Sequence, residues 1–341
     1  MTEKHYGGAS SHGMKNKNSQ TSNKIIDNKK KTDDGPSEDN STFNGELSKE
    51  DIKDIKLAGE IAKKVVDYAK SIIKKGMPLI EIANKVDAKI EELKAKPAFP
   101  INLSINEIAA HSTPSWNDET LASGLLKVDI GVQINGWTAD TAFSMDLDNN
   151  EENKKLIKAA ELAVKAGTDK INIGVKVNEI GKDIEKAIKS QGFNPIINLS
   201  GHSITQYDIH AGITIPNCDN SQVFALEPGV YAIEPFATNG LGTVRDGKPS
   251  GIYKLDREGA VRDTFAREVL QFIVDEYQTL PFCSRWIYKK FGSRGLLALR
   301  LIEQAGVLHH YSQLVESGKG KVAQAEHTVL LLQKEKVITT F

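Results

Sequence analysis

This chain has few cysteines, almost no net charge and no long apolar run. Its 341 residues include only Cys218 and Cys283, which are too few for a disulfide framework and lack the spacing of metal-binding cysteines. Lys and Arg number 44 against 45 Asp and Glu, so nothing in the charge balance suggests nucleic acid or an anionic membrane as a partner. No apolar run approaches the roughly 18 residues of a membrane span, and the N-terminus lacks a signal-peptide core. We therefore expect a soluble, cytoplasmic protein that binds neither nucleic acid nor membrane.

The first 47 residues also lack any periodic apolar pattern. They are rich in Asn, Ser, Lys, Gly and Asp, and such a segment cannot bury enough apolar surface to offset its ordering entropy. We predict a disordered polar tail over residues 1–47 and a folded domain over residues 48–341. Order begins at Ser48, which forms a capping-box pattern with Asp51 and predicts the start of a helix.

A pattern of helices followed by a strand occurs twice. Apolar residues recur at helical spacing from Ile52 to a stop at Gly76, and a second helix follows Pro78. The stretch G-x4-E-I-x3-V-D-x2-I, residues 76–90, returns as G-x4-E-I-x3-I-E-x2-I at 174–188. Two copies at so long a period do not make a solenoid. They predict two α-α-β halves related by a pseudo-two-fold axis, with the site between them.

Residues from about 240 to 317 interrupt this repeat. Charged loops alternate there with helical stretches near 262–277 and 294–305. We interpret this segment as an inserted helical subdomain within the second half.

The dipeptide Asn135-Gly136 lies between two β-rich runs and is the strongest hairpin signal in the chain, because both residues tolerate the positive φ of a type I′ turn. If these residues form the whole loop, Gly131 lies opposite Asp140, and Asp129 shares their face. The two aspartates are then diagonal neighbours, with Cα atoms roughly 7–8 Å apart and carboxylates on the same face. They would repel each other unless a cation lies between them, which favours a divalent metal. The alternative is a pair of solvated aspartates on an outer sheet face.

Three further polar residues occur in or beside β-rich runs. His202 follows one such run, Glu234 lies in the predicted strand 230–236, and Glu326 lies in the predicted strand 322–330. Singly, each has an ordinary explanation, as a hydrogen-bonded core histidine or a solvent-facing glutamate. Together with the hairpin aspartates they supply oxygen and nitrogen ligands without a thiolate. That set disfavours a structural zinc site and favours a hard to borderline metal pair.

The segments around these residues resemble the metal-ligand motifs of the methionine aminopeptidases. They read K-V-D-I-G-V, T-A-D-T-A, N-L-S-G-H-S-I, A-I-E-P-F and A-Q-A-E-H-T, and the histidine segments N-E-I-A-A-H-S-T-P and D-I-H-A-G are similar too. The resemblance runs from about Ile52 to the C-terminus. The insertion, with its L-P-F-x-x-R-W segment, resembles the type II subfamily of archaea and eukaryotes. One departure is Ala325, where the family usually has Phe.

The resemblance implies an α+β pita-bread fold and a methionyl aminopeptidase, a hydrolase that removes the initiator methionine when the second residue is small. It implies two divalent metal ions per chain, Co, Mn, Fe or Zn, with an activated hydroxide between them. Asp129 would bind one ion through both oxygens. His202 and Glu234 would bind the other ion, and Asp140 and Glu326 would bridge the two.

The resemblance also assigns the remaining site residues. Glu234 would be the proton shuttle, His210 would hydrogen-bond the scissile carbonyl oxygen and His111 would contact the scissile amide nitrogen. The residues that would line the methionine pocket are Phe99, Ile209, Phe236 and Tyr311. Phe99 and Ile209 could equally be ordinary core residues.

Two other functions stay open at this point. One is a prolidase or creatinase relative of the same fold, although such proteins carry a folded N-terminal domain where this chain has a polar tail. The other is an inactive binding homologue of the proliferation-associated type, although all the expected ligands are present. We expect N-terminal methionine of nascent polypeptides as the substrate and a monomeric protein, and an association with the ribosome stays open.

Overall fold

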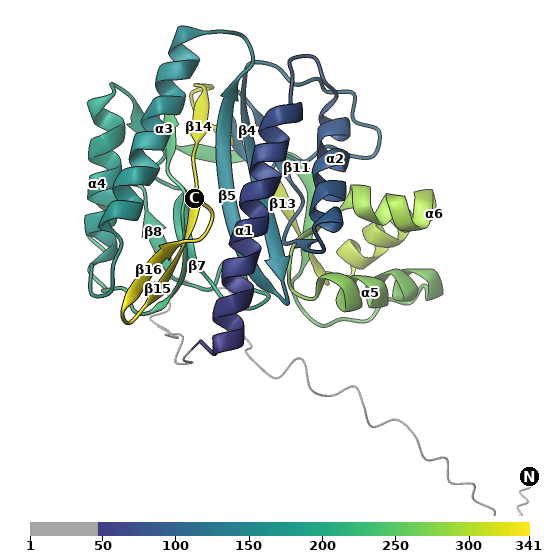
Figure 1. Cartoon of the computed structure of the whole chain (residues 1–341). Helices are drawn as coiled ribbons and strands as arrows, with labels where there is room; N and C mark the ends of the chain where they lie inside the picture. Colours follow the sequence, from purple (N-terminus) through teal and green to yellow (C-terminus); the bar gives the residue numbers. More distant parts are fainter. Residues whose placement is uncertain (1–46) are drawn as a thin grey trace, which may run out of the picture. The chain divides into compact units, whose positions relative to one another are not determined.

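The computed structural model describes residues 47–341, so the predicted tail lies outside the described residues except for its last position. The helices α1 and α2 lie on one side of a central block of strands and α3 and α4 lie on the other, while α5 and α6 form a separate group (Figure 1). The helices are α1 (Lys49–Ile72), α2 (Leu79–Glu92), α3 (Glu151–Lys170), α4 (Val177–Ser190), α5 (Thr264–Tyr277) and α6 (Ser284–Gln304).

The strands of the described residues fall into four sheets. The first contains β1 (Lys96–Pro97), β4 (Leu125–Ile134), β2 (Asn102–Ile105) and β5 (Trp137–Asp146). The second contains β14 (Val322–Gln324), β10 (Phe236–Thr238) and β6 (Asn194–Pro195). The third contains β12 (Phe282–Cys283), β11 (Val244–Leu255), β13 (Leu308–Glu316) and β3 (Ile108–Ala110). The fourth contains β16 (Glu335–Ile338), β15 (His327–Leu332), β9 (Gly229–Ile233), β7 (Ser200–Ile204) and β8 (Thr214–Pro216).

The capping box that begins α1 is confirmed. Ser48 Oγ accepts a hydrogen bond from the Asp51 N–H at 3.1 Å, and Asp51 Oδ2 accepts one from the Ser48 N–H at 2.9 Å. These two bonds satisfy backbone donors that the helix start leaves without partners. The helix ends at Ile72, earlier than predicted, and Gly76 lies in the following turn with φ +82°.

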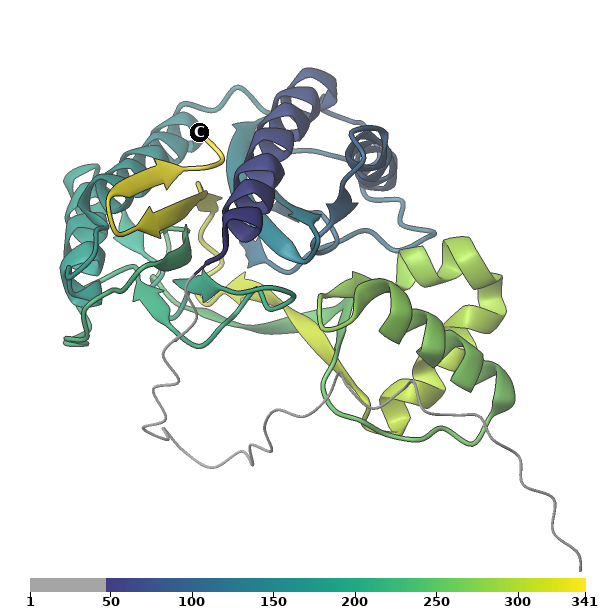
Figure 2. The same ribbon diagram turned by 60° about the horizontal axis from the view of Figure 1, so that its bottom comes forward.

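Each pair of helices covers its own apolar core, as the sequence repeat predicts. One core lies between α1, α2 and the first sheet and includes Val65, Val86 and Val128. The other lies between α3, α4 and the fourth sheet and includes Ile184 and Ile233. Figure 2 shows the two helix pairs on the outer faces of the strands. The predicted α+β arrangement of two α-α-β halves is therefore confirmed.

The hairpin forms in the predicted register. Asn135-Gly136 is the whole loop, with φ of +51° and +86°, as a type I′ turn requires. Gly131 lies opposite Asp140, and Asp129 lies opposite Ala142. The two aspartates are consequently diagonal neighbours on one face of the sheet.

Two of the predicted strands are broken at the positions that carry glutamates. The run 230–236 divides into β9 and β10, with Glu234 and Pro235 between them, because Pro235 has no N–H for the ladder. The run 322–330 divides into β14 and β15, with Glu326 between them. His202, which we expected to follow a strand, lies inside β7.

The helical insertion has a core of its own. Tyr253, Ile273, Phe282 and Leu299 belong to that core, which α5 and α6 cover (Figure 2). The predicted helical stretch near 294–305 corresponds to the part of α6 that follows Gly292, and the turns of α6 from Ser284 onward were not predicted. Gly292, with φ +63° and ψ −154°, kinks this helix and interrupts the apolar period that the prediction used.

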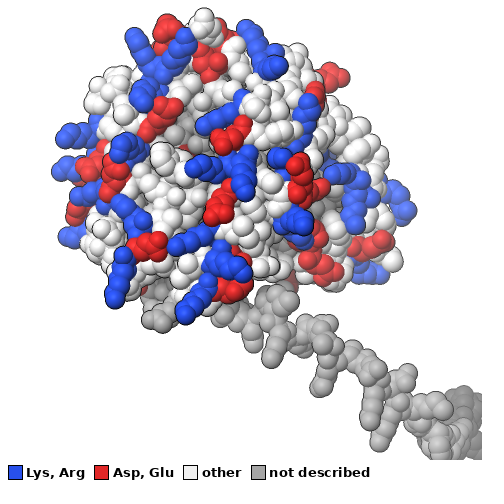
Figure 3. Space-filling view, in the orientation of Figure 1, with Lys and Arg blue, Asp and Glu red and all other residues white. Residues whose placement is uncertain are grey.

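Charged side chains of both signs are interspersed over the face that Figure 3 shows. This mixture matches the nearly equal numbers of basic and acidic residues in the chain. Within residues 47–341, no helix has both the length and the apolar character that crossing a membrane requires.

The close approach of α1 to the C-terminal segment gives a first prediction. A Cβ atom built on Gly59 would lie 2.3 Å from the Thr339 carbonyl oxygen. We expect Gly59→Ala to lower the free energy of unfolding by about 1–3 kcal/mol, because this backbone contact has no flexible end that can move away. At an unconstrained helix position the same change would stabilise the protein by about 1 kcal/mol. Urea unfolding measures the difference.

Gly167→Ala is the matched control for that prediction. A Cβ atom on Gly167 would meet side-chain ends of Ile233 at 2.7 Å and Ile184 at 3.0 Å, which can adjust their rotamers. We expect a smaller loss of stability there. A Gly59→Ala variant as stable as the wild type would contradict the proposed contact.

Candidate active site

A cavity of about 370 Å³ lies where the two halves meet, and every site residue predicted from the sequence lines it. These residues are Phe99, His111, Asp129, Asp140, His202, Ile209, His210, Glu234, Phe236, Tyr311 and Glu326. In the part of the chain that the structure describes, no lysine or arginine lines this cavity. The acidic residues in it therefore lack a protein counter-charge.

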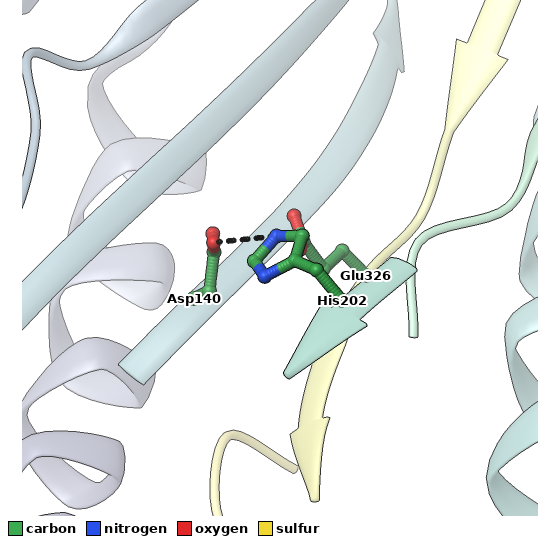
Figure 4. A group of neighbouring side chains, drawn as sticks. All are labelled: Asp140, His202 and Glu326. Carbon is green, nitrogen blue, oxygen red and sulfur yellow. Dashed lines mark ion pairs between the residues drawn. The ribbon is translucent and has the colours of Figure 1, made fainter. Parts of the chain in front are cut away.

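Three of the predicted metal ligands converge closely. One ligand atom from each of Asp140, His202 and Glu326 lies within 4.8 Å of the others. His202 Nε2 lies 3.7 Å from Asp140 Oδ2 and 3.4 Å from Glu234 Oε1. Figure 4 shows Asp140 on β5, His202 on β7 and Glu326 between β14 and β15, with their polar ends close together. Segments distant in the sequence thus supply one cluster.

Backbone contacts hold both glutamates at the cluster. The Glu326 N–H donates to the Ala142 carbonyl oxygen at 2.9 Å, which links Glu326 directly to β5. Asn217, which is fully buried, donates from Nδ2 to the carbonyl oxygens of Leu199 at 3.0 Å and Glu234 at 3.3 Å. The breaks in the predicted strands are therefore fixed parts of the site.

Burial strongly disfavours the charged forms of these carboxyl groups. It raises the pKa of Asp129 to about 7, and the Gln324 hydrogen bond opposes part of that shift. Burial, followed by repulsion from neighbouring carboxylates, raises the pKa values of Asp140, Glu234 and Glu326 well above their usual range. Without a cation, the cluster therefore retains protons near neutral pH.

The residues present fit a divalent metal. Asp129 Oδ1 and Asp140 Oδ1 are buried and have no hydrogen-bond partner among the described residues. Buried oxygens without a partner are costly, and a cation would satisfy both of them. Carboxylate oxygens with one imidazole and no thiolate suit a hard to borderline ion.

Gln324 is a contributor that sequence reasoning missed. Its Nε2 donates to Glu326 Oε2 at 3.5 Å, and its side-chain amide lowers the pKa of Asp129, against the effect of burial. Gln324 is buried and therefore connects ligands from two segments. Thr328 was also missed, and its Oγ1 accepts from the Asp140 N–H at 2.8 Å. The sequence signal that could have found them is side-chain alternation along a strand, since both residues lie two positions from Glu326 and would share its face.

The two predicted histidines lie beside the cluster. His111 has a positive φ of +56°, and its ring contacts Tyr311 edge-on with centroids 5.2 Å apart. Burial, followed by the charge of His210, lowers the pKa of His111 to about 4, so its imidazole is neutral at pH 7. His210 is exposed, and its ring packs edge-on against His202 at 4.5 Å.

An apolar wall lies next to the cluster. Phe99 packs over Gly131, where a Cβ atom would lie 2.3 Å from the ring, so only glycine fits there. Phe99, Ile209 and Leu280 belong to one buried group. Leu280 and the adjacent Pro281, which lines the cavity, come from the insertion, and neither was predicted from the sequence as a site residue.

Comparison with known proteins gives a consistent result. Residues 53–263 match the model of the family "Metallopeptidase family M24". The chain is 45% identical over 297 residues to a methionine aminopeptidase of Pyrococcus abyssi, covering 85% of this chain and 99% of that protein.

Solved structures share the fold at low sequence identity. A thermophilic Arx1 has a TM-score of 0.74 at 17% identity, covering 86% of this chain and 91% of that one. A methionine aminopeptidase from Rickettsia prowazekii has a TM-score of 0.62 at 20% identity, covering 87% and 99%. These likenesses support the pita-bread fold expected from the sequence.

The buried carboxyl groups give a prediction about stability. Adding Mn or Co to chelator-treated protein at pH 7.5 should raise the melting temperature by several degrees, because the cation binds the folded site far better than the unfolded chain. The raised pKa of Asp129 means that the metal-free fold binds an extra proton between the usual carboxyl pKa of about 4 and about 7, and the raised pKa values of Asp140, Glu234 and Glu326 act in the same direction. Repulsion is therefore greatest at pH 7.5 and is relieved at pH 5, where protons also compete with metal. Melting curves at both pH values should show a smaller difference between the melting temperatures of metal-free and metal-loaded protein at pH 5.

Asp140→Asn serves as the control in that experiment. It removes one buried anion, so the rise in melting temperature on adding metal at pH 7.5 should be smaller than in the wild-type protein. Equal melting temperatures with chelator and with metal for the wild-type protein would show that these carboxylates do not form one cation site.

Proposed function

The chain belongs to the methionine aminopeptidases of metallopeptidase family M24 and removes the N-terminal methionine of polypeptides, and we propose that it does so with two divalent metal ions. The observation that carries this proposal is the convergence of Asp140, His202 and Glu326 within 4.8 Å, in a cavity that no lysine or arginine of residues 47–341 lines. Metal use itself follows from the family.

The cleft residues divide naturally between two ions. Asp129 would hold one ion, His202 and Glu234 would hold the other, and Asp140 and Glu326 would contact both. Supporting this division, His202 and Glu234 lie 3.4 Å apart, whereas Asp129 comes from the other half of the molecule. The donor atoms suit Co, Mn, Fe or Zn.

Bound cations would supply Lewis-acid polarisation of the scissile carbonyl and a lower pKa for the attacking water. Glu234 is then placed to move the proton. It takes a proton from the water as the oxygen attacks the carbonyl carbon, and it returns that proton to the leaving amine nitrogen as the C–N bond breaks. Its buried position beside His202 keeps bulk water from competing for this proton.

The two histidines would orient the peptide bond. His111 is neutral at pH 7 and carries a single ring N–H, so it can hydrogen-bond at the scissile amide nitrogen without adding charge. His210, at the exposed edge of the cavity, would donate to the carbonyl oxygen as negative charge develops there.

Specificity would come from the shape of the cavity. Phe99, Ile209 and Pro281 form an apolar surface suited to a methionine side chain, and Leu280 packs with Phe99 and Ile209. His111 and Tyr311, which pack against each other, leave the following residue a narrow space. A small second residue is accommodated there, while a large one overlaps with these rings.

The two alternatives from the sequence are not favoured. A prolidase-like activity has no support beyond the shared fold, whereas the Pyrococcus abyssi relative matches 99% of its own length at 45% identity. An inactive binding homologue would lose ligands, whereas all the predicted ligands line one cavity here.

A peptide panel tests the proposed function. Metal-loaded enzyme should release methionine from Met-Ala-Ser and Met-Gly peptides and spare Met-Lys and Met-Leu peptides, because steric overlap excludes large second residues. Amino-acid analysis of the products, together with metal content by elemental analysis, measures both claims. Efficient cleavage of Met-Lys, or release of the first residue from Xaa-Pro dipeptides, would favour the prolidase alternative.

Substitution of a shared ligand tests the mechanism. Asp140→Asn should lower kcat/KM on Met-Ala-Ser by at least about a hundredfold, because it weakens the binding of both proposed ions. Each tenfold loss of kcat/KM corresponds to about 1.4 kcal/mol of transition-state stabilisation. Metal titration calorimetry should show weaker binding in parallel. Asp148→Asn changes an exposed aspartate paired with Lys75 and is the control, with activity near wild type. An active Asp140→Asn variant would refute the assignment.

A further inference from the structure

A buried cluster joins the helical insertion to the first half of the molecule. Arg285, which is only 4% exposed, donates from Nη1 to Asp87 Oδ2 at 2.6 Å and to Asn84 Oδ1 at 3.0 Å. Trp286 Nε1 donates to the same Asp87 Oδ2 at 2.7 Å. Asp87 belongs to α2 and the other two begin α6, so we refer to Asp87, Arg285 and Trp286 as the docking cluster.

The proposed reaction does not use the docking cluster. Arg285 and Trp286 are the last two residues of the L-P-F-x-x-R-W segment, and none of the three cluster residues is among the described residues that line the active-site cavity. A buried ion pair is also a weak source of stability, because desolvation of both charges offsets their attraction. An ion pair that gives little stability but bonds two elements at fixed geometry is better explained by positioning.

The segment that the docking cluster could position is the short connection from α5 to α6. Leu280 in this connection is 3% exposed and packs in one group with Phe99 and Ile209. Pro281, its neighbour, lines the active-site cavity directly. The insertion therefore contributes part of the apolar wall proposed for methionine.

Packed aromatic rings connect the docking cluster to this wall. The ring of Tyr277 stacks on Trp286 with centroids 5.6 Å apart and on Phe282 with centroids 5.1 Å apart. Tyr277 and Phe282 lie on either side of Leu280 in the chain, and the Leu280 N–H donates to the Tyr277 carbonyl oxygen. A shift of Trp286 would consequently shift both ends of the connection.

The connection does not hold this conformation through its own backbone preference. Gln278 has φ +52° and ψ −116°, which an L-residue adopts only under constraint. At the same turn, Thr279 Oγ1 donates to the Tyr207 carbonyl oxygen at 2.5 Å. External contacts on both sides therefore hold Leu280 and Pro281 against the cavity.

We propose that the docking cluster positions the Leu280–Pro281 wall of the methionine pocket and thereby sets affinity and selectivity for the first residue of the substrate. This inference rests on the proposed function of the cavity. It predicts an effect on substrate binding rather than on the metal cluster, because the metal ligands come from other elements.

The test uses the full-length, metal-loaded enzyme with the double variant Asp87→Leu and Arg285→Met. Replacing both charges together leaves no unpaired buried charge, so the fold should be retained. On Met-Ala-Ser we expect KM to rise about fivefold or more with kcat within about twofold, the pattern of lost ground-state binding. The preference for Met-Ala-Ser over Leu-Ala-Ser should fall by a similar factor, while metal affinity measured by calorimetry stays unchanged.

Glu303→Gln is the matched control. Glu303 Oε1 pairs with His310 Nδ1 at 2.9 Å inside the insertion and does not bridge to α2. Its substitution should leave KM and the Met-to-Leu preference within about twofold of wild type, because the connection to the first half is intact.

The outcomes separate this inference from the proposed function. Methionine release by the wild-type enzyme in the same assay tests the proposed function alone. A folded double variant with wild-type KM and wild-type Met-to-Leu preference would overturn the positioning role. If the double variant does not fold, Arg285→Lys replaces it, since lysine keeps the charge but lacks the planar guanidinium whose Nη1 donates to both Asp87 and Asn84. That variant should raise KM and lower the preference to a smaller extent, and wild-type values for both would overturn the inference.

Discussion

Repulsion among buried carboxylates is the constraint on which this structure depends. Asp129, Asp140, Glu234 and Glu326 line one cavity with no lysine or arginine among the described residues that surround it, and burial raises the pKa of each. A fold that holds four such groups together must be stabilised elsewhere, and each half does this with its own apolar core. Without metal, the repulsion and burial of these carboxylates lower the stability of the fold. A bound cation relieves that repulsion, which favours cation binding at the site.

The arrangement in two halves explains how the ligands meet. The hairpin β4–β5 presents its aspartates from the first half, and β7 and the end of β9 present His202 and Glu234 from the second. Glu326 joins them through its backbone contact with Ala142. Both glutamates lie where a strand is interrupted, so their backbones take part in single, specific hydrogen bonds instead of continuous ladders. The site is thus built from rigid strands and from the fixed breaks between them.

The insertion gives the site a component that the repeat does not contain. Its helices have a separate core, yet Pro281 lines the cavity, Leu280 packs with Phe99 and Ile209 behind it, and Arg285 bonds to α2. A subdomain with its own core can move as a unit unless other contacts hold it. Buried polar contacts define one geometry more sharply than apolar contacts do, because hydrogen bonds are directional. This property connects the docking cluster to the shape of the pocket.

The sequence by itself determined the local features of this protein. Asn135-Gly136 defined the hairpin and its register, and with them the shared face of Asp129 and Asp140, because turn type and strand alternation are short-range properties. Ser48 and Asp51 likewise predicted the start of α1, and the resemblance in the motifs named acidic and histidine residues that all line one cavity. Only the tertiary structure decided that the strands break at Glu234 and Glu326, that Gln324 bonds to Glu326, and that Leu280 packs with Phe99 and Ile209. Those features depend on contacts between segments far apart in the chain, and neither periodicity nor local propensity carries information about such contacts.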